Sequence, residues 1–198
     1  IVGRGGHGAH AYQAVDPVLV AGHIITAVQS IVSRNLKALD SAVISLCAVR
    51  AGELGAFSVI PEEAQLTGTV RTFRADVQNQ VEQRLADLCG AIAQGFGARA
   101  EVRFERLYPA TVNHPLQTEF AERVARDLVG TQQVVTDLEP SMGAEDFAFM
   151  LQARPGAYLR LGQGSADGAF LHNSRYDFND EVLPIGAAWH ASLVEQAL

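Results

Sequence analysis

The order of apolar patterns over the first 110 residues constrains the fold of this chain more than any other feature. Stretches typical of strands and stripes of 3.6-residue period typical of helices follow one another as strand, helix, strand, strand, helix, strand. We expect strands at 1–5, 42–50, 64–73 and 99–107 and helices at 17–35 and 77–96. This order predicts a split βαβ, ferredoxin-like arrangement, in which a four-stranded antiparallel sheet carries two helices on one face.

Both expected helices begin at a recognisable signal. Asp16 followed by Pro17 is a helix N-cap with proline at the first helical position, and Asp76 is expected to cap the second helix. The residues from 1 to 110 therefore predict one complete α+β domain.

The rest of the chain has a different pattern, which begins after the breaks at Pro109, Asn113 and Pro115. Helices are expected at 115–129, 144–152 and 183–197, short strands at 132–136 and 157–161, and a long loop at 162–180. Two short strands are too few for a sheet of their own, so residues 111–198 are expected to be half of a larger α/β domain. A loop of this length is typical of a functional segment or of one that lacks its partner.

Charge and composition exclude several classes of protein. The net charge of −7 over 198 residues argues against binding to nucleic acid, and Lys37 is the only lysine, which excludes a phosphate-binding P-loop. The two cysteines are too few for a disulfide scaffold, and no apolar stretch is long enough to span a membrane, so we expect a cytoplasmic protein. The sequence opens at Ile1 without a methionine, and we expect it to be part of a longer chain.

Three segments place polar side chains in turn-like contexts. In GRGGHGAHAY, His7 lies among glycines, where an imidazole can donate to an oxyanion or bind a metal; the alternative is a surface histidine at a strand exit. In SMGAEDFAFM, Glu145 and Asp146 precede a helix, where they either complement the helix dipole or orient a metal ligand or substrate group. In FLHNSRYDFNDEVLP, His172 precedes several carboxylates, but one histidine does not make a zinc site.

Taken together and in order, these segments carry a family resemblance. GGHGA, then VDP, SVIP, GTVRTF, TVNHP, GAEDFAFM, PGAY and LHNSRYDFNDEVLPIGA resemble the metallopeptidase and amidohydrolase family of hippurate hydrolase, aminoacylase and auxin-conjugate (indole-acetyl-amino-acid) hydrolases. The resemblance spans all 198 residues.

The resemblance implies a metal-dependent hydrolase of N-acyl amino acids. The catalytic domain of such an enzyme binds two divalent metal ions, which are zinc, manganese, cobalt or nickel, and is interrupted by a split βαβ lid that forms the dimer interface. Residues 1–110 match the lid, and residues 111–198 match the C-terminal part of the catalytic domain. The implied partners are a small N-acyl amino acid and a second subunit, with neither nucleic acid nor membrane.

The resemblance also implies roles for individual residues. His172 matches the last metal ligand, and His7 matches the lid histidine that stabilises the tetrahedral oxyanion, often in the partner's active site. Arg71 would engage a substrate carboxylate through its bidentate guanidinium. Asn113, Glu145 and Asp146 fall in motifs near the cleft and are candidates for substrate binding.

Departures from the family pattern limit this interpretation. Ala11-Tyr12 stands where relatives commonly have Pro-His, and Ser58 where many have Asn. The upstream metal ligands and the general-base glutamate have no counterpart in this sequence, so the 198 residues alone are expected to be inactive. The alternatives are a dimerising or ligand-binding module without catalysis, and a piece of the intact enzyme.

Overall fold

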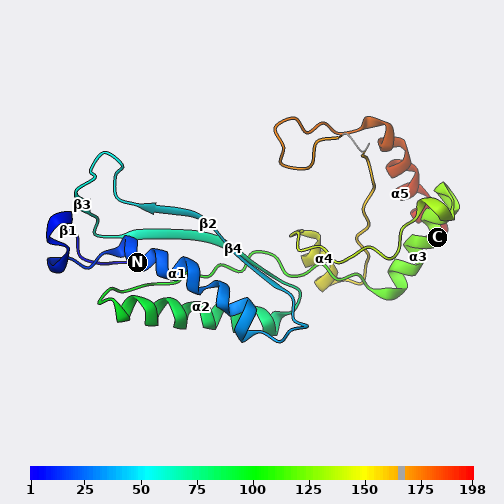
Figure 1. Cartoon of the computed structure of the whole chain (residues 1–198). Helices are drawn as coiled ribbons and strands as arrows, with labels where there is room; N and C mark the ends of the chain where they lie inside the picture. Colours follow the sequence, from blue (N-terminus) through cyan, green and yellow to red (C-terminus); the bar gives the residue numbers. More distant parts are fainter. Residues whose placement is uncertain (165–167) are drawn as a thin grey trace. The chain divides into compact units, whose positions relative to one another are not determined.

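The structure, a computed structural model of the chain, describes residues 1–164 and 168–198 and divides into two units (Figure 1). Unit 1 comprises Ile1–Ala110 with Met142–Ala144, and unit 2 comprises Thr111–Ser141 with Glu145–Leu198. The loop expected at 162–180 includes residues 165–167, which lie outside the described residues.

Unit 1 contains two small antiparallel sheets. In the larger, β2 (Ala42–Ala51) pairs with β4 (Ala64–Thr72), and the register shifts between Leu46 and Ala48. The smaller pairs β1 (Gly6–His7) with β3 (Val59–Ile60). The strand expected at 1–5 is reduced to single bridges, which are Val2 with Glu63, Val2 with Arg99, and Arg4 with Val15.

Two helices, α1 (Pro17–Ala27) and α2 (Ala75–Gly95), lie side by side on one face of the β2–β4 hairpin (Figure 1). Asp16 caps α1 as expected, accepting hydrogen bonds from the N–H groups of Val18 and Leu19. A short π-helical turn, η2 (Ile31–Asn35), follows α1 within the range expected to be helical. The cap expected at Asp76 is wrong, because Arg74 occupies the N-cap position of α2 and makes no side-chain cap bond.

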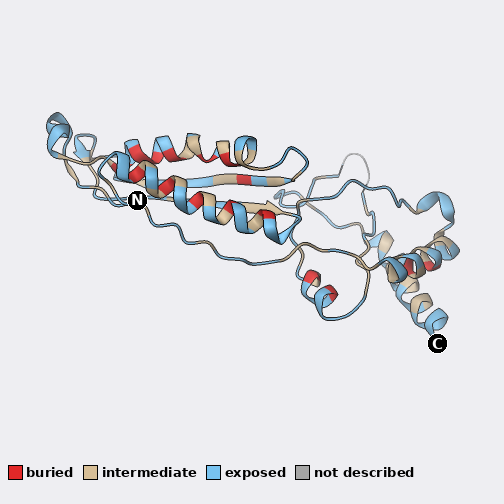
Figure 2. Ribbon diagram, turned by 90° about the horizontal axis from the view of Figure 1, so that it is seen from below, coloured by how far each residue is buried: buried red, intermediate tan, exposed pale blue. Residues whose placement is uncertain are grey.

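The core of unit 1 lies between the helices and the hairpin (Figure 2). Its buried members recur at helical spacing along α1 with the turn that follows it and along α2, and they include one strand residue. They are Val20, Ile24, Val28, Ile31, Ile44, Val77, Val81, Leu85, Cys89 and Ala93. Burying one side chain of the size of valine or isoleucine contributes about 1.5–3 kcal/mol. The periodic apolar stripes of the sequence therefore account for how the helices dock.

The four-stranded sheet expected for this unit is not formed in the described residues. Val2 and Arg99 exchange two backbone hydrogen bonds of 2.7 and 2.9 Å, but no strand continues beyond Arg99. In an antiparallel register, each residue after Arg99 pairs with a residue one place before Val2, so Ala100 would pair with Ile1. In this register, residues 1–198 contain no partner for residues 101–107. A strand needs a partner for its backbone groups, so residues 101–107 remain without a ladder.

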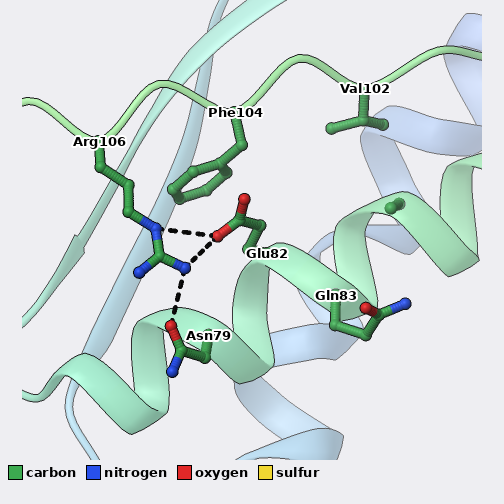
Figure 3. Close-up of a pocket in the computed structure, with 7 residues that line it drawn as sticks. Asn79, Glu82, Gln83, Val102, Phe104 and Arg106 are labelled. Carbon is green, nitrogen blue, oxygen red and sulfur yellow. Dashed lines mark hydrogen bonds and ion pairs between the residues drawn. The ribbon is translucent and has the colours of Figure 1, made fainter.

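The segment that follows Arg99 nevertheless keeps the two-residue alternation of a strand. Val102, Phe104 and Arg106 line a hollow of about 400 Å³ against α2 (Figure 3). Arg106 donates to the side-chain oxygens of Glu82 and Asn79, the latter at 2.7 Å. This segment was expected to be a strand, and in the structure Val102 and Phe104 face the same hollow although no strand is formed.

Unit 2 is mostly helical in its described part. Its elements are α3 (Pro115–Val129), η3 (Thr131–Gln133), α4 (Phe147–Ala153), η4 (Asp180–Val182) and α5 (Leu183–Ala197). α3 and α5 have the predicted bounds and pack together, with the Trp189 indole N–H donating to the carbonyl of Ala121 at 3.4 Å. The strands expected at 132–136 and 157–161 are not formed, because neither segment pairs with another strand among the described residues.

None of the helices in the described part of the chain has the length and apolar character that a membrane crossing requires.

Candidate active site

The glycine-rich loop of unit 1 carries the first candidate residue, His7. β1 holds it in register with Val59, and the N–H of Gly8 donates to the carbonyl of Ser58 at 2.7 Å. A side chain at Gly5 would bring its Cβ within 2.8 Å of the carbonyl oxygen of Ile60, so only glycine allows this close approach of the two backbones. The glycines therefore fix the main chain on either side of the imidazole.

His7 is exposed, and its ring has a defined hydrogen bond. Its Nδ1 accepts from the backbone N–H of Ala9 at 3.1 Å, which makes His7 the side-chain N-cap of the 3₁₀ turn η1 (Gly8–Gln13). The ring of His10 lies 5.7 Å from that of His7, and Tyr12 meets His10 edge-on at 6.1 Å.

Arg71 lies on β4, opposite Val43 of β2. Its neighbour Val70 packs against the core, so Arg71 belongs to the face of the hairpin that the helices do not cover. The guanidinium donates to the carbonyl of Val70 at 3.1 Å, and among the described residues it makes no ion pair. This arrangement leaves charged donors for a carboxylate.

Asn113 is engaged in unit 2 by the backbone of Tyr158. Its amide nitrogen donates to the carbonyl of Tyr158 at 2.9 Å, and its amide oxygen accepts from the N–H of Tyr158 at 2.8 Å. Next to it, His114 receives the N–H of Gly156 on Nδ1 at 3.2 Å. Asn113 thus holds two chain segments together through both ends of its side chain.

Tyr158 in turn contacts Glu145. Its hydroxyl donates to the Glu145 carboxylate at 2.8 Å, and its ring lies 5.6 Å from that of Phe147. This hydrogen bond, helped by Asp146 and the backbone N–H of Phe147, lowers the pKa of Glu145 below its ordinary value. The same contact raises the pKa of Tyr158, because ionising the phenol would place a second negative charge beside the carboxylate.

Asp146 is exposed and occupies the N-cap position of α4, but its side chain makes no cap hydrogen bond. Two of the predicted site residues, Asn113 and Glu145, are thus brought together through Tyr158. No role was predicted for Tyr158 from the sequence, although PGAY is among the motifs that carry the resemblance. The available signal was a tyrosine hydroxyl in a partly apolar segment, which requires a partner.

His172 is exposed in a tight turn that the N–H of Asn173 closes onto the carbonyl of Phe170 at 3.1 Å. Its φ of 67° makes it the one non-glycine residue with a positive φ in the described part of the chain. Such a conformation is uncommon for residues other than glycine, and it is enriched at functional sites.

A two-metal centre was tested against the donor set of the structure. Among residues 1–164 and 168–198, no group of three or more His, Cys, Asp or Glu side chains is placed to hold a metal ion. The described residues therefore do not by themselves fit the two metal ions that the resemblance implies.

Known proteins resemble this chain over nearly its whole length. A sequence model described as peptidase family M20/M25/M40 matches residues 5–196. The hippurate hydrolase of Campylobacter jejuni is 35% identical over 193 residues, which cover 98% of this chain and 49% of that protein. The IAA-amino acid hydrolase ILR1-like 4 of Arabidopsis thaliana is 34% identical over 205 residues, covering 100% of this chain and 46% of that protein.

A solved structure extends the likeness to the fold. The Bacillus subtilis YXEP protein, described as a dinuclear metal-binding peptidase from the M20 family, matches with a TM-score of 0.69 and 29% identity. That match covers 90% of this chain and 45% of the solved chain. The chain spans about half the length of the curated relatives it matches.

Proposed function

We infer the function of this chain from its family: it belongs to peptidase family M20/M25/M40. We propose that it forms part of an enzyme that hydrolyses the amide bond of N-acyl amino acids such as hippurate in a metal-dependent reaction. The observation that carries the proposal is the family match over residues 5–196, which includes both units. The hippurate hydrolase and the IAA-amino acid hydrolase among its relatives support this substrate class.

His7 and Arg71 are the two residues of unit 1 that contact the substrate in this proposal. The exposed imidazole of His7 donates a hydrogen bond to the oxyanion that forms when the amide carbonyl becomes tetrahedral. Arg71 binds the carboxylate of the amino acid, for which a guanidinium provides paired donors. Its freedom from ion pairs within the described residues supports this role.

Glu145, Asp146 and Asn113 shape the part of the site that unit 2 contributes. Asn113 acts as a positioning residue in this proposal, because both ends of its amide are engaged with Tyr158. Glu145 stays ionised and oriented by Tyr158, and it presents a carboxylate to the substrate or to a metal ligand. Asp146 is exposed beside it and contributes negative charge.

His172 is proposed as one ligand of a centre of two divalent metal ions. The neighbour described as dinuclear supports a pair of metals in this family, and the positive φ of His172 supports a special role for that turn. The remaining ligands and the general base are not among the described residues, so the chain alone is proposed to be inactive.

Residues 1–110 are proposed to form the lid and dimerisation domain, and residues 111–198 the C-terminal part of the catalytic domain. The four-stranded sheet of the lid would be completed by a strand that pairs with 99–107 in the register of the Val2–Arg99 bridge. A second copy would pair along β2, which has β4 on one edge and no strand on the other in the described chain. Two free cysteines, Cys47 and Cys89, support a reducing, cytoplasmic location.

Hydrolysis assays test the proposal. The complete gene product is expected to release glycine from hippurate, and a chelator is expected to abolish the activity. Replacing His7 by Ala lowers kcat by about 100-fold or more, because an oxyanion donor is lost. The matched control His10→Ala, in the same loop, leaves kcat near the wild-type value. Activity that resists chelation, or hippurate hydrolysis by residues 1–198 alone, would contradict the proposal.

A second candidate function is that the chain serves only for dimerisation or ligand binding. It follows from the open edge of β2 in the described chain. Sedimentation of residues 1–110 at micromolar concentration examines the dimer. A monomer there would count against pairing through this unit, whereas a dimer together with an inactive complete gene product would favour the non-catalytic module.

A further inference from the structure

The hydrogen bond between Ala9 and His7 determines which ring nitrogen of His7 carries the proton. A neutral imidazole has one N–H donor and one acceptor nitrogen. Because Nδ1 accepts from the backbone N–H of Ala9 at 3.1 Å, the ring proton belongs on Nε2.

The donor in this contact is held in place by the backbone around it. The N–H of Gly8 is bonded to the carbonyl of Ser58 at 2.7 Å, and β1 pairs with β3 immediately before it. A Cβ at Gly8 would lie 3.3 Å from the carbonyl oxygen of Ser58, so the two backbones are in close contact at this point. The N–H of Ala9 therefore keeps its direction toward His7, whatever the side chain at position 9.

We propose that the backbone N–H of Ala9 selects the Nε2–H tautomer of His7 and thereby makes this side chain a neutral hydrogen-bond donor directed away from its own loop. The opposite tautomer would present a lone pair at Nε2, which repels an oxyanion. The tautomer itself follows from the contact, whereas its catalytic consequence rests on the role proposed above for His7. Ala9 acts through His7 and is a positioning residue.

The tautomer can be measured in the 198-residue chain without any activity assay. With ¹⁵N-labelled histidine at alkaline pH, long-range ¹H–¹⁵N spectra distinguish the two tautomers of each neutral ring. His7→Asn assigns the His7 signals. The ratio of Nε2–H to Nδ1–H at His7 is expected to exceed that at His10 by about fivefold, the effect of one ordinary hydrogen bond.

Two proline variants identify the donor. Ala9→Pro removes the N–H and should bring the His7 ratio to that of His10, whereas Ala11→Pro places the same ring two residues later and should leave it unchanged. Equal ratios at His7 and His10 in the unaltered chain, or a His7 that is mainly Nδ1–H, would overturn the inference. Because that comparison needs no variant, it decides the question even if Ala9→Pro disturbs the turn.

Kinetics of the complete gene product separate this inference from the proposed function. Ala9→Pro is expected to lower kcat about fivefold with little change in KM, and Ala11→Pro to leave both near wild type. If the tautomer is selected as described but His7→Ala keeps full kcat, the role of His7 in the proposed function fails and the tautomer stands. If His7→Ala lowers kcat but the His7 and His10 ratios are equal, the positioning role of Ala9 fails.

Discussion

The two units bury their apolar residues to very different extents (Figure 2). Unit 1 has a cluster of ten buried side chains drawn from both helices and the hairpin. In the described part of unit 2 the buried apolar residues are Ala121, Val124, Ala148 and Leu151, and α5 contains none. The helices of unit 1 have a sheet to cover, whereas the main element contacts of α3 and α5 within the described residues are with each other and with the short turns η3 and η4.

This difference shows that an apolar pattern identifies what a segment can bury but not whether the same chain supplies the covering surface. Large apolar side chains are exposed on both units, among them Leu54 on unit 1 and Met150 and Val194 on unit 2. The contrast between the units therefore lies in the buried cluster, which unit 1 has and the described part of unit 2 has only in small pieces. Unit 1 is therefore expected to be stable by itself and unit 2 is not.

Separating the units has the largest expected effect. Residues 1–110 alone should unfold in one cooperative urea transition, because the ten-residue cluster lies within them. Residues 111–198 alone should show no cooperative transition and should bind a hydrophobic dye, as expected for a chain with so small a core. Circular dichroism and dye fluorescence measure both properties. A cooperative transition in 111–198 would remove the contrast between the units.

A charge introduced into the core of unit 1 tests the same difference in burial between the two units. Val81 is 0% exposed on α2, so Val81→Asp places an unpaired carboxylate in the core and should lower the free energy of unfolding by about 4 kcal/mol or more. The matched control is Val194→Asp on α5, where the side chain is exposed and the change should stay within about 0.5 kcal/mol.

The single tryptophan reports on unit 2 in that experiment. Trp189 contacts α3, and because unit 2 has little buried core to lose, the Trp189 fluorescence should change little in Val81→Asp while the circular dichroism of unit 1 is lost. Parallel loss of both signals would show that the units unfold as one.

Helices were predicted more accurately than strands for a physical reason. The ranges 115–129 and 183–197 match α3 and α5, because a helix satisfies its backbone hydrogen bonds within the segment. The segments 99–107, 132–136 and 157–161 have the patterns of strands but form none, because a strand depends on a partner elsewhere. The pair 42–50 and 64–73 formed β2 and β4 because each is the other's partner.

The candidate site shows the same dependence on distant partners. The glycines around His7 and the carboxylate of Glu145 could be recognised from local sequence. The partners of Tyr158 could not, because they lie 45 and 13 positions away, at Asn113 and Glu145. Asp76 was assigned as a cap from its position alone, but it is instead bonded by the guanidinium of Arg74.

Replacing Tyr158 by Phe has the smallest expected effect, and it examines the polar cluster in which Tyr158 joins two predicted site residues, Asn113 and Glu145. The Tyr158 hydroxyl is the largest cause of the lowered pKa of Glu145, so the variant should move this pKa up toward its ordinary value of about 4.3. Because the pKa of Glu145 is lower in the folded chain than in the unfolded one, the contact stabilises the fold above about pH 4.3 and is lost as the pH falls through the lowered value. In Tyr158→Phe the dependence of stability on acid pH should become shallower.

Carboxyl ¹³C titration measures the shift in the Glu145 pKa, and Glu145→Gln assigns the signal. The control Tyr176→Phe loses a hydroxyl that is bonded to Gln163 and should leave the Glu145 pKa unchanged. An unaltered Glu145 titration in Tyr158→Phe would show that unit 2 does not maintain this cluster in solution, and the contrast with unit 1 would then extend to its polar contacts.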